Sequence, residues 1–342
     1  MAEAFFDLSR SDRTAALAQA AATSGRPDNI LEKDIWVVWT LRSLFDSPFG
    51  KHLCFKGGTS LSKAYGIIER FSEDLDLTYD VRQILEDDLQ EATADPLPSS
   101  RSQANKWAKL TKKRLQGWVE EVARPHIELC LADINVPVRL EVKPDQIALT
   151  YEDAAHTKTD YLASRILIEF GARSTGEPMR VMDIACDAAI HLPMLEFPMA
   201  SPRVMAAERT FWEKVTAAHA FCMEERLRGD RFARHWYDIV KLDAAGIAAS
   251  ALGEVDLGRA VARHKNFFFS VKGRDGKRVD YLDAVSGGLH LVPTDGLRAI
   301  LQDDYTRMVE AGLLEGSAPS FDEIMDWCER IERQANGLLA PG

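Results

Sequence analysis

The fold is decided by Leu53-Cys54-Phe55-Lys56-Gly57-Gly58-Thr59 and by Asp74-Leu75-Asp76-Leu77-Thr78-Tyr79-Asp80. The first stretch is a short apolar run that ends at two glycines. Apolar residues at helical spacing follow the glycines, namely Leu61, Ala64, Tyr65, Ile68 and Phe71. The order predicts a strand, a glycine turn and a helix.

The second stretch alternates polar and apolar residues, which is typical of a half-buried strand. Asp74 and Asp76 are two residues apart, so their side chains share one face of that strand. Their mutual repulsion is costly unless a divalent cation bridges them, and Mg²⁺ suits hard oxygen ligands that also meet phosphate oxygens. A solvated strand face with no ligand is the alternative.

The glycine turn is a candidate anion site. Gly57 and Gly58 allow a tight turn, and the free N–H groups of a following helix favour an anion. Thr59 and Ser60 add hydroxyl groups, and Lys63 adds charge. No Walker A or Gly-x-Gly-x-x-Gly pattern is present, which argues against a P-loop or a dinucleotide fold. A plain turn without a ligand is the alternative reading.

The rest of the chain suggests a small mixed sheet and then helices. Alternation over residues 138–151 around Pro144-Asp145 predicts a hairpin, and residues 166–170 predict one more strand, near which the sheet is expected to end. We expect an α/β (α+β) fold in three parts: an N-terminal helical extension (1–50), a core (51–200) and a mainly helical C-terminal domain (201–342).

Composition excludes several classes of protein. The 342 residues include 46% hydrophobic and 28% charged side chains, as in an ordinary globular protein. No apolar run reaches the ~18–20 residues of a membrane span, and the acidic start is unlike a secretory signal, so we expect a cytoplasmic protein with no membrane partner. Forty-two basic against 53 acidic residues give a net charge of −11, which disfavours nonspecific coating of nucleic acid. Five scattered cysteines suggest neither disulfides nor zinc.

Gly57-Gly58-Thr59 followed by Ser72-Glu73-Asp74-Leu75-Asp76 resembles the signature of the DNA polymerase beta-like nucleotidyltransferases. More narrowly, the chain resembles the AbiEii/AbiGii-type toxins of toxin–antitoxin and phage-abortive systems, which include the MenT toxins. Further matches lie at Leu31-Glu32-Lys33-Asp34-Ile35-Trp36, Phe211-Trp212-Glu213-Lys214 and His235-Trp236-Tyr237-Asp238-Ile239.

The resemblance implies a polymerase beta-like core and a magnesium-dependent nucleotidyltransferase. Such a toxin moves NMP from NTP to the 3′ end of tRNA, which blocks translation, and it has a cognate antitoxin. Transfer to a small molecule or a protein is an alternative, because one fold supports many acceptors. A nucleotide-binding module that does no chemistry and acts through a protein partner is another.

Carried over to this sequence, the family pattern implies metal binding by Asp74 and Asp76, phosphate contact by Lys214 and a catalytic role for Asp238. Glu169, from residues 166–170, is a candidate third metal ligand, with an exposed strand acid as the alternative. The alternative for Lys214, which lies on the flank of an apolar helix stripe, is a snorkelling side chain that packs its methylene groups on the core and keeps its ammonium group in water. Asp238 is a base, an orienting partner of Lys214, or an ion-pair partner of Arg234.

The predicted nucleotide-binding set comprises Gly57, Gly58, Thr59, Ser60, Lys63, Ser72 and Lys214. A basic helix that follows a Pro/Ser-rich loop is the candidate RNA-binding surface, because lysine and arginine contact phosphates. Its predicted RNA-binding residues are Lys106, Lys109, Lys112, Lys113 and Arg114. A solvated helix face is the alternative.

Overall fold

The computed structural model describes residues 3–70, 72, 74–89, 96–155, 163–224, 231–311, 314 and 318–340. The chain packs as two compact units, which are described separately. The first comprises residues 1–64, 73–96 and 109–204, and the second comprises residues 65–72, 97–108 and 205–342. Helix α5 (Arg101–Trp118) contributes residues to both.

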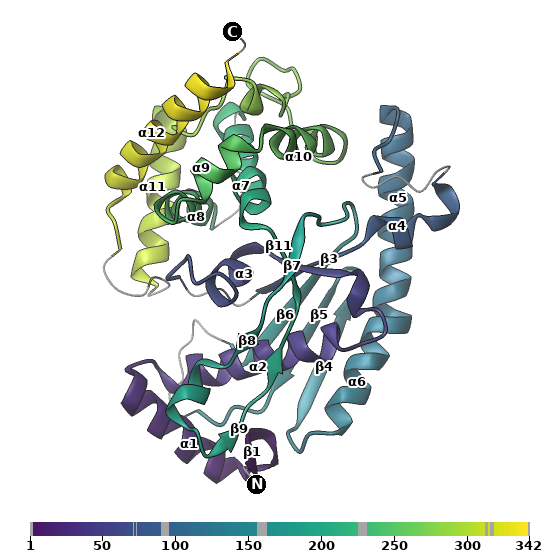
Figure 1. The fold of residues 1–342 in the computed structure, drawn as a ribbon, viewed down its shortest axis with the longest axis vertical. Coiled ribbons are helices and arrows are strands. Elements are labelled where there is room, and N and C mark those ends of the chain that lie inside the picture. Colours follow the sequence, from purple (N-terminus) through teal and green to yellow (C-terminus); the bar gives the residue numbers. More distant parts are fainter. Residues whose placement is uncertain are drawn as a thin grey trace. The chain divides into compact units, whose positions relative to one another are not determined.

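The first unit is built on a mixed sheet (Figure 1). In the described residues its seven strands follow the order β4 (Val138–Lys143), β5 (Gln146–Tyr151), β6 (Arg165–Gly171), β3 (Asp74–Tyr79), β2 (Leu53–Lys56), β11 (Arg203–Met205) and β7 (Met179–Val181). Strand β3 runs parallel to β6 and antiparallel to β2. Two small pairs accompany the sheet, β1 (Glu3–Ala4) with β9 (Leu195–Glu196) and β8 (Ile184–Ala185) with β10 (Met199–Ala200).

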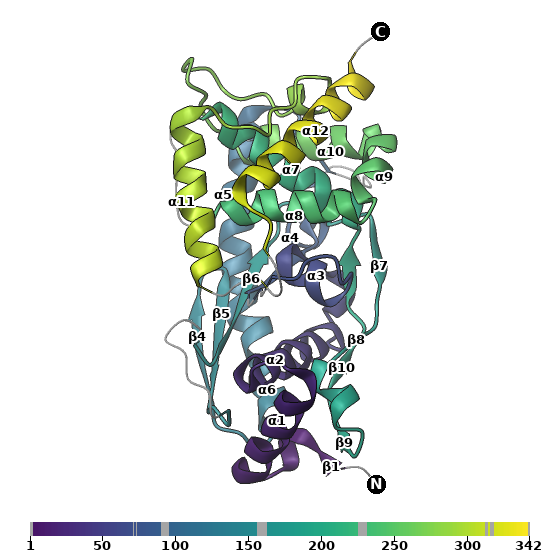
Figure 2. The same cartoon turned by 90° about the vertical axis from the view of Figure 1, so that its left-hand side faces the viewer.

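Helices cover this sheet because each has an apolar stripe to bury. Helix α2 (Asp28–Phe45) is buried along most of its length and contacts β6 and β10, as Figure 2 lets the reader follow. Its Trp36 ring stacks on Tyr151 of β5, with ring centroids 4.8 Å apart. The remaining helices of the unit are α1 (Arg10–Ser24), α3 (Gly57–Lys63), α4 (Val81–Ile84), α6 (Arg124–Ala132) and the C-terminal part of α5.

The second unit is helical. Its helices are α7 (Ala207–Met223), α8 (Ala233–Ala244), α9 (Ile247–Gly253), α10 (Val255–Phe268), α11 (Asp295–Glu310) and α12 (Phe321–Leu339). Helix α8 packs against α7, α11 and α12. Side chains fix two of the helix starts: Asp304 accepts hydrogen bonds from the backbone N–H groups of Arg231 and Ala233, and Ser320 with Glu323 forms a capping box for α12.

The predicted α/β core followed by a mainly helical second half is confirmed. The 138–151 hairpin is formed by β4 and β5, and β3 alternates as expected, with Asp74 and Asp76 half-buried between buried leucines. The five cysteines are free thiols.

Two expectations about the core are wrong. The helix after the glycine turn ends at Lys63, because Gly66 adopts a positive φ of 63° and Tyr65 instead donates its hydroxyl to the Met205 carbonyl. The sheet also continues beyond β6, since β11 and β7 add two short strands whose few residues give little periodicity.

The division into residues 1–50, 51–200 and 201–342 stays a prediction. No helix among the described residues combines the length and the apolar character that a membrane crossing requires.

Candidate active site

The aspartates of β3 and the glycine turn meet closely in the first unit. A Cβ atom added at Gly57 would lie 2.0 Å from Asp76 Oδ2, so only glycine leaves room for this carboxylate. Gly57 also has a φ of 80°, which favours glycine. The Asp76 carboxylate therefore lies directly against the backbone where α3 begins. We call the face that carries Asp74 and Asp76 the acidic face.

Glu169 is the neighbour of the acidic face on the next strand. It is paired in register with Asp76 across the parallel strands β3 and β6, so the two side chains share a face of the sheet. Gln146 of β5 donates its amide Nε2–H to Glu169 Oε1 at 2.6 Å. Glu169 is thus positioned near the acidic face, and its role as a third ligand stays a prediction.

The donor chemistry of the acidic face suits Mg²⁺. No group of three His, Cys, Asp or Glu side chains that could hold a metal occurs within the described ranges. Magnesium in nucleotide enzymes is, however, commonly bound by one or two carboxylates together with substrate phosphates, so a complete protein cage is not required. Asp74 and Asp76 are the residues that fit this pattern.

The hydroxyl groups after the turn hold the local structure together. Buried Thr59 donates its hydroxyl to the Asp74 carbonyl oxygen at 2.6 Å, which ties α3 to the start of β3. Buried Ser60 donates its hydroxyl to the Gly57 carbonyl oxygen at 2.9 Å. These bonds give both hydroxyls a structural task, so we leave Thr59 and Ser60 out of the proposed nucleotide contacts.

Lys63 is occupied as well. Its ammonium group lies 2.5 Å from Asp34 Oδ1 and 2.6 Å from Asp187 Oδ1, and Arg26 also pairs with Asp187. Burial lowers the pKa of Lys63, but the two carboxylates outweigh it and raise the pKa. These pairs anchor the end of α3 to α2 and to the 3-10 helix Asp187–His191, so Lys63 too is left out of the proposed contacts.

The Leu31–Trp36 motif serves the same anchoring function. Glu32 and Lys33 are both buried, at 2% exposure. Glu32 accepts hydrogen bonds from the N–H groups of Ala154 and Ala155, and Lys33 donates to the Ala163 carbonyl at 3.0 Å. Burial raises the pKa of Glu32 to about 8. The charged residues of this motif therefore connect α2 to the segments that follow β5 and precede β6.

The second unit contains a buried ionic cluster around Asp238. This carboxylate is fully buried, with Lys214 Nζ 2.8 Å from Oδ2 and with Arg70 bound through Nε and Nη2 at 2.7 and 2.8 Å. Burial raises the pKa of Asp238, but Arg70 and Lys214 together outweigh it and hold the pKa well below its usual range. Such a carboxylate is a weak base, so the cluster favours an orienting role for Asp238.

Sequence reasoning missed Arg70. Asp238 pairs with Arg70 and Lys214 in the described residues, whereas the anticipated pairing with Arg234 is not found there. Arg70 and Asp238 lie 168 residues apart, and Arg70 belongs to no recognised motif, so no local signal pointed to it. His235 next to this cluster is half-buried, and its desolvation, followed by the charge of Lys214, lowers its pKa.

The predicted RNA-binding residues of α5 fall into two groups. Lys109, Lys112 and Lys113 are exposed and form no ion pair with any residue that the structure describes. Arg114 is half-buried and donates to the Ile84 carbonyl at 2.7 Å, with Asp88 as its ion-pair partner at 2.8 Å. Arg114 is therefore committed to packing α5 against α4. Lys106 is exposed and Ser72 is half-buried. RNA binding by Lys106 and nucleotide binding by Ser72 stay predictions.

Comparison with known families gives a match along most of the chain. The family described as nucleotidyl transferase AbiEii toxin, of type IV toxin–antitoxin systems, matches residues 39–327. The chain belongs to the AbiEii family. The match includes the glycine turn, the acidic face and the Asp238 cluster. The AbiEii membership makes the protein a nucleotidyltransferase of the toxin–antitoxin class and confirms the resemblance seen in its motifs.

Solved structures give distant likenesses. The nucleotidyltransferase toxin MenT4 of Mycobacterium tuberculosis H37Rv is 16% identical, with 98% of this chain and 100% of MenT4 covered and a TM-score of 0.41. JHP933 of Helicobacter pylori is 14% identical, with 92% and 94% covered and a TM-score of 0.42. A putative nucleotidyltransferase from H. pylori is also 14% identical, with 90% and 94% covered and a TM-score of 0.42. No curated protein gave a significant match.

Proposed function

We propose that this AbiEii toxin transfers NMP from NTP to the 3′ end of tRNA in a magnesium-dependent reaction and so blocks translation. The observation that carries the proposal is the acidic face: two carboxylates on one face of β3, with Asp76 pressed against the glycine turn. Paired carboxylates next to a turn with free backbone N–H groups are what a triphosphate and its metal require.

Asp74 and Asp76 would hold Mg²⁺ through their carboxylate oxygens. When bound, the ion neutralises charge on the triphosphate and makes the attacking hydroxyl more acidic. The protein's own contribution is to fix where these oxygens lie. Thr59 does this for Asp74 by holding its carbonyl, and Gly57 does it for Asp76 by leaving room for its carboxylate.

Lys214 is the proposed phosphate contact of the second unit. In the described residues its ammonium group pairs with Asp238 alone, and Asp238 is shared with Arg70. Asp238 therefore orients Lys214 but neutralises it only in part, because Asp238 also pairs with Arg70. Part of the positive charge of Lys214 remains available to an anion. Asp238 is a positioning residue in this scheme.

The acceptor is proposed from the exposed lysines of α5. Lys109, Lys112 and Lys113 present three charges with no ion-pair partner among the residues that the structure describes, in a protein whose net charge is −11. Phosphate contacts of this kind attract nucleic acid without reading its sequence. They support an RNA acceptor, and the choice of tRNA rests on the resemblance to the toxin family.

The test is transfer of label from each α-³²P-labelled NTP to total tRNA in the presence of Mg²⁺. We expect wild type to label tRNA and both Asp74→Asn and Asp76→Asn to lose at least about 10³-fold in rate, because charge stabilisation at a reacting phosphate is a large catalytic term. Asp145→Asn is the matched control, since Asp145 is exposed in the turn between β4 and β5 of the same unit. Sequencing of the 3′ ends would identify the nucleotide added.

Three results would contradict the proposal. Label transferred by Asp76→Asn as well as by wild type would remove the acidic face from the chemistry. Label that goes only to a small molecule or a protein would replace the acceptor. NTP that binds but is never turned over, with any acceptor, would favour a nucleotide-binding module that acts through a partner.

A further inference from the structure

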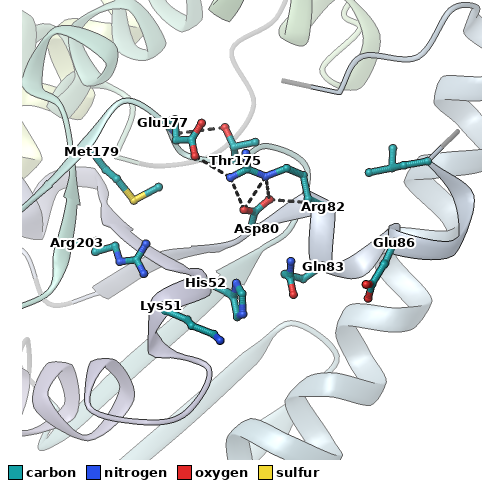
Figure 3. Close-up of a pocket in the computed structure, with 11 residues that line it drawn as sticks. Lys51, His52, Asp80, Arg82, Gln83, Glu86, Thr175, Glu177, Met179 and Arg203 are labelled. Atoms are coloured by element: carbon teal, nitrogen blue, oxygen red, sulfur yellow. Dashed lines mark hydrogen bonds and ion pairs between the residues drawn. The ribbon is translucent and has the colours of Figure 1, made fainter. Parts of the chain in front are cut away.

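A cavity of about 490 Å³ lies in the first unit, apart from the acidic face. Figure 3 shows it between the segment before β2, the end of β3, helix α4 and the start of β11. His52 precedes β2 and Asp80 follows β3, whereas Gly57 and Asp76 lie toward the other ends of these strands. Asp80 lies four positions after Asp76 along extended chain, which corresponds to about 13 Å.

Three charged residues of this cavity form an ion-paired triad, in which one arginine faces two carboxylates and a net charge of −1 remains. Arg82 donates to both Asp80 oxygens, at 2.6 to 3.0 Å, and to Glu177 Oε1 at 2.7 Å. The hydrogen bonds to Asp80 raise the pKa of Arg82 and outweigh burial, which lowers it. The dashed lines in Figure 3 show this triad along one wall. Because its side chains already bind one another, the residues of the other wall are the ones available to a ligand.

The other wall carries two cations, Lys51 and Arg203. Lys51, from the 3-10 helix Gly50–His52, and Arg203, from β11, form no ion pair with any residue that the structure describes. Figure 3 shows them on the same side of the cavity with His52 beside them. Two cations held by separate elements, with an imidazole beside them, provide donors from several directions, as an anion site requires.

His52 lies among several of these charged groups. Burial is the largest cause that lowers the pKa of His52, and the charges of Lys51, Arg203 and Arg82 lower it further, against an opposing effect of Asp80. Glu86 is the other charged group of the lining, on the 3-10 helix after α4, and it is exposed. An anion placed among these cations would reverse their effect and favour the protonated imidazole.

We propose that this cavity binds a phosphate monoester of nucleotide size, with its phosphate held by Lys51, Arg203 and His52. A phosphate dianion matches two cations in charge and has oxygens enough for all three donors. The volume lies within the usual range of small-molecule sites and exceeds what inorganic phosphate alone would fill. Gln83 and Glu86 offer hydrogen bonds to hydroxyl or base groups on the rest of the ligand. This inference does not depend on the proposed function.

Such a phosphate has two possible sources, a free nucleoside monophosphate or the phosphorylated end of an RNA. The probes are therefore AMP, CMP, GMP and UMP, inorganic phosphate, adenosine, and one short oligoribonucleotide with and without a terminal phosphate. Binding is measured by calorimetry and by the proton NMR signal of the His52 ring, assigned through His52→Gln. Tighter binding of nucleotide than of oligoribonucleotide would identify the free ligand, and the reverse order would identify an RNA end.

We expect at least one phosphorylated probe to bind and to raise the pKa of His52. Arg203→Gln should weaken this binding about 10-fold, since one charge-assisted contact is lost and tenfold corresponds to about 1.4 kcal/mol. Lys51→Gln should do the same, and because Lys51 is exposed this variant is a second test if Arg203→Gln folds poorly. Lys143→Gln, at an exposed cation of β4 in the same unit, should leave the affinity unchanged.

Asp76→Asn separates this cavity from the acidic face, because the variant should keep the full affinity for the monophosphate. The proposal is overturned if no phosphorylated probe binds at millimolar concentration, or if adenosine binds as tightly as AMP. It is equally overturned if Arg203→Gln and Lys51→Gln both behave like Lys143→Gln, or if binding depends on Asp76 instead.

Discussion

Lys63 and Lys214 make an instructive comparison, because the sequence predicts both as phosphate contacts and the structure surrounds them differently. Lys63 in the first unit has two carboxylates within 2.6 Å, those of Asp34 and Asp187. Lys214 in the second unit has Asp238, which it shares with Arg70. One lysine is thus fully compensated, and the other shares a single carboxylate with a second cation.

The carboxylates that bind these two lysines, Asp34 and Asp238, also differ, in the direction of their pKa shifts. Burial raises the pKa of both, but two cations reverse the effect at Asp238, whereas Lys63 does not reverse it at Asp34, which also faces Asp187. A lysine inside a protein is therefore available to a phosphate only where its neighbours leave part of its charge uncompensated. The comparison assigns Lys63 to the framework and Lys214 to the proposed reaction.

The largest expected effect is on stability and comes from Asp238→Asn. This change leaves Arg70 and Lys214 buried beside each other without their carboxylate, which should cost about 3–5 kcal/mol of unfolding free energy. Asp34→Asn should cost less, about 1–3 kcal/mol, because Lys63 keeps Asp187. Urea denaturation of both variants measures the difference. Equal losses of unfolding free energy would show that the Asp238 and Asp34 clusters do not differ in how their charges are balanced.

The next effect is on the rate of transfer. Lys214→Met should lower nucleotidyl transfer about 10²-fold, the usual loss for one donor to a reacting oxygen. Lys63→Met should lower stability and leave the rate per folded molecule within about 2-fold, because its ammonium group is spent on Asp34 and Asp187. Labelling assays corrected for the folded fraction compare the two. A greater loss of rate in Lys63→Met would reverse the assignment.

The pH dependence of stability should have opposite signs at the two carboxylates. The lowered pKa of Asp238 means that its contribution is complete above pH ~4, near the unfolded pKa, and is lost as the pH falls toward the folded pKa. The raised pKa of Asp34 means that its contribution is complete below pH ~4 and is lost as the pH rises through the folded pKa.

Unfolding free energies of wild type and both Asn variants, measured from pH 2.5 to 8, test these signs. The advantage of wild type over Asp238→Asn should shrink toward acid pH, and its advantage over Asp34→Asn should shrink toward alkaline pH. Parallel curves for the two variants would mean that the carboxylates do not differ in their charge balance.

The smallest effect on stability is expected for the exposed cations of α5, which have no ion-pair partner in the described part of the chain. Replacing Lys109, Lys112 and Lys113 by Gln should change the unfolding free energy by less than about 0.5 kcal/mol, because these side chains are exposed. The same triple variant should bind tRNA more weakly and with a salt dependence reduced by about 2 in its logarithmic slope. Filter binding over a range of salt concentrations measures this slope, with Lys143→Gln as the control. An unchanged slope would exclude these lysines from the RNA surface.

Local patterns predicted the parts of the fold that obey a simple period. The alternation in β3 and in the β4–β5 hairpin was read correctly, since one face of each strand is buried. The helix after Gly58 was extended too far because apolar spacing does not reveal that Gly66 leaves the helix. Strands β7 and β11 escaped notice because three residues cannot display a period.

Within the candidate site, the sequence could predict only which residues lie together because they are neighbours along the chain. Asp74 and Asp76 are two residues apart on one strand, so their shared face follows from the chain itself. Arg70 could not be found, because it reaches Asp238 from 168 residues away. The carbonyl partners of the Thr59 and Ser60 hydroxyls could not be predicted, because a sequence shows a donor but not the carbonyl that it meets.

By itself, the sequence determined which residues alternate, where the glycines permit a turn, and that two aspartates lie side by side, because these properties depend on neighbours along the chain. The tertiary structure decided which charges are compensated: Lys63 pairs with Asp34 and Asp187, Lys214 shares Asp238 with Arg70, and Lys51 and Arg203 have no carboxylate partner among the described residues. Charge balance depends on distance in space, and the chain fixes that distance only when it folds.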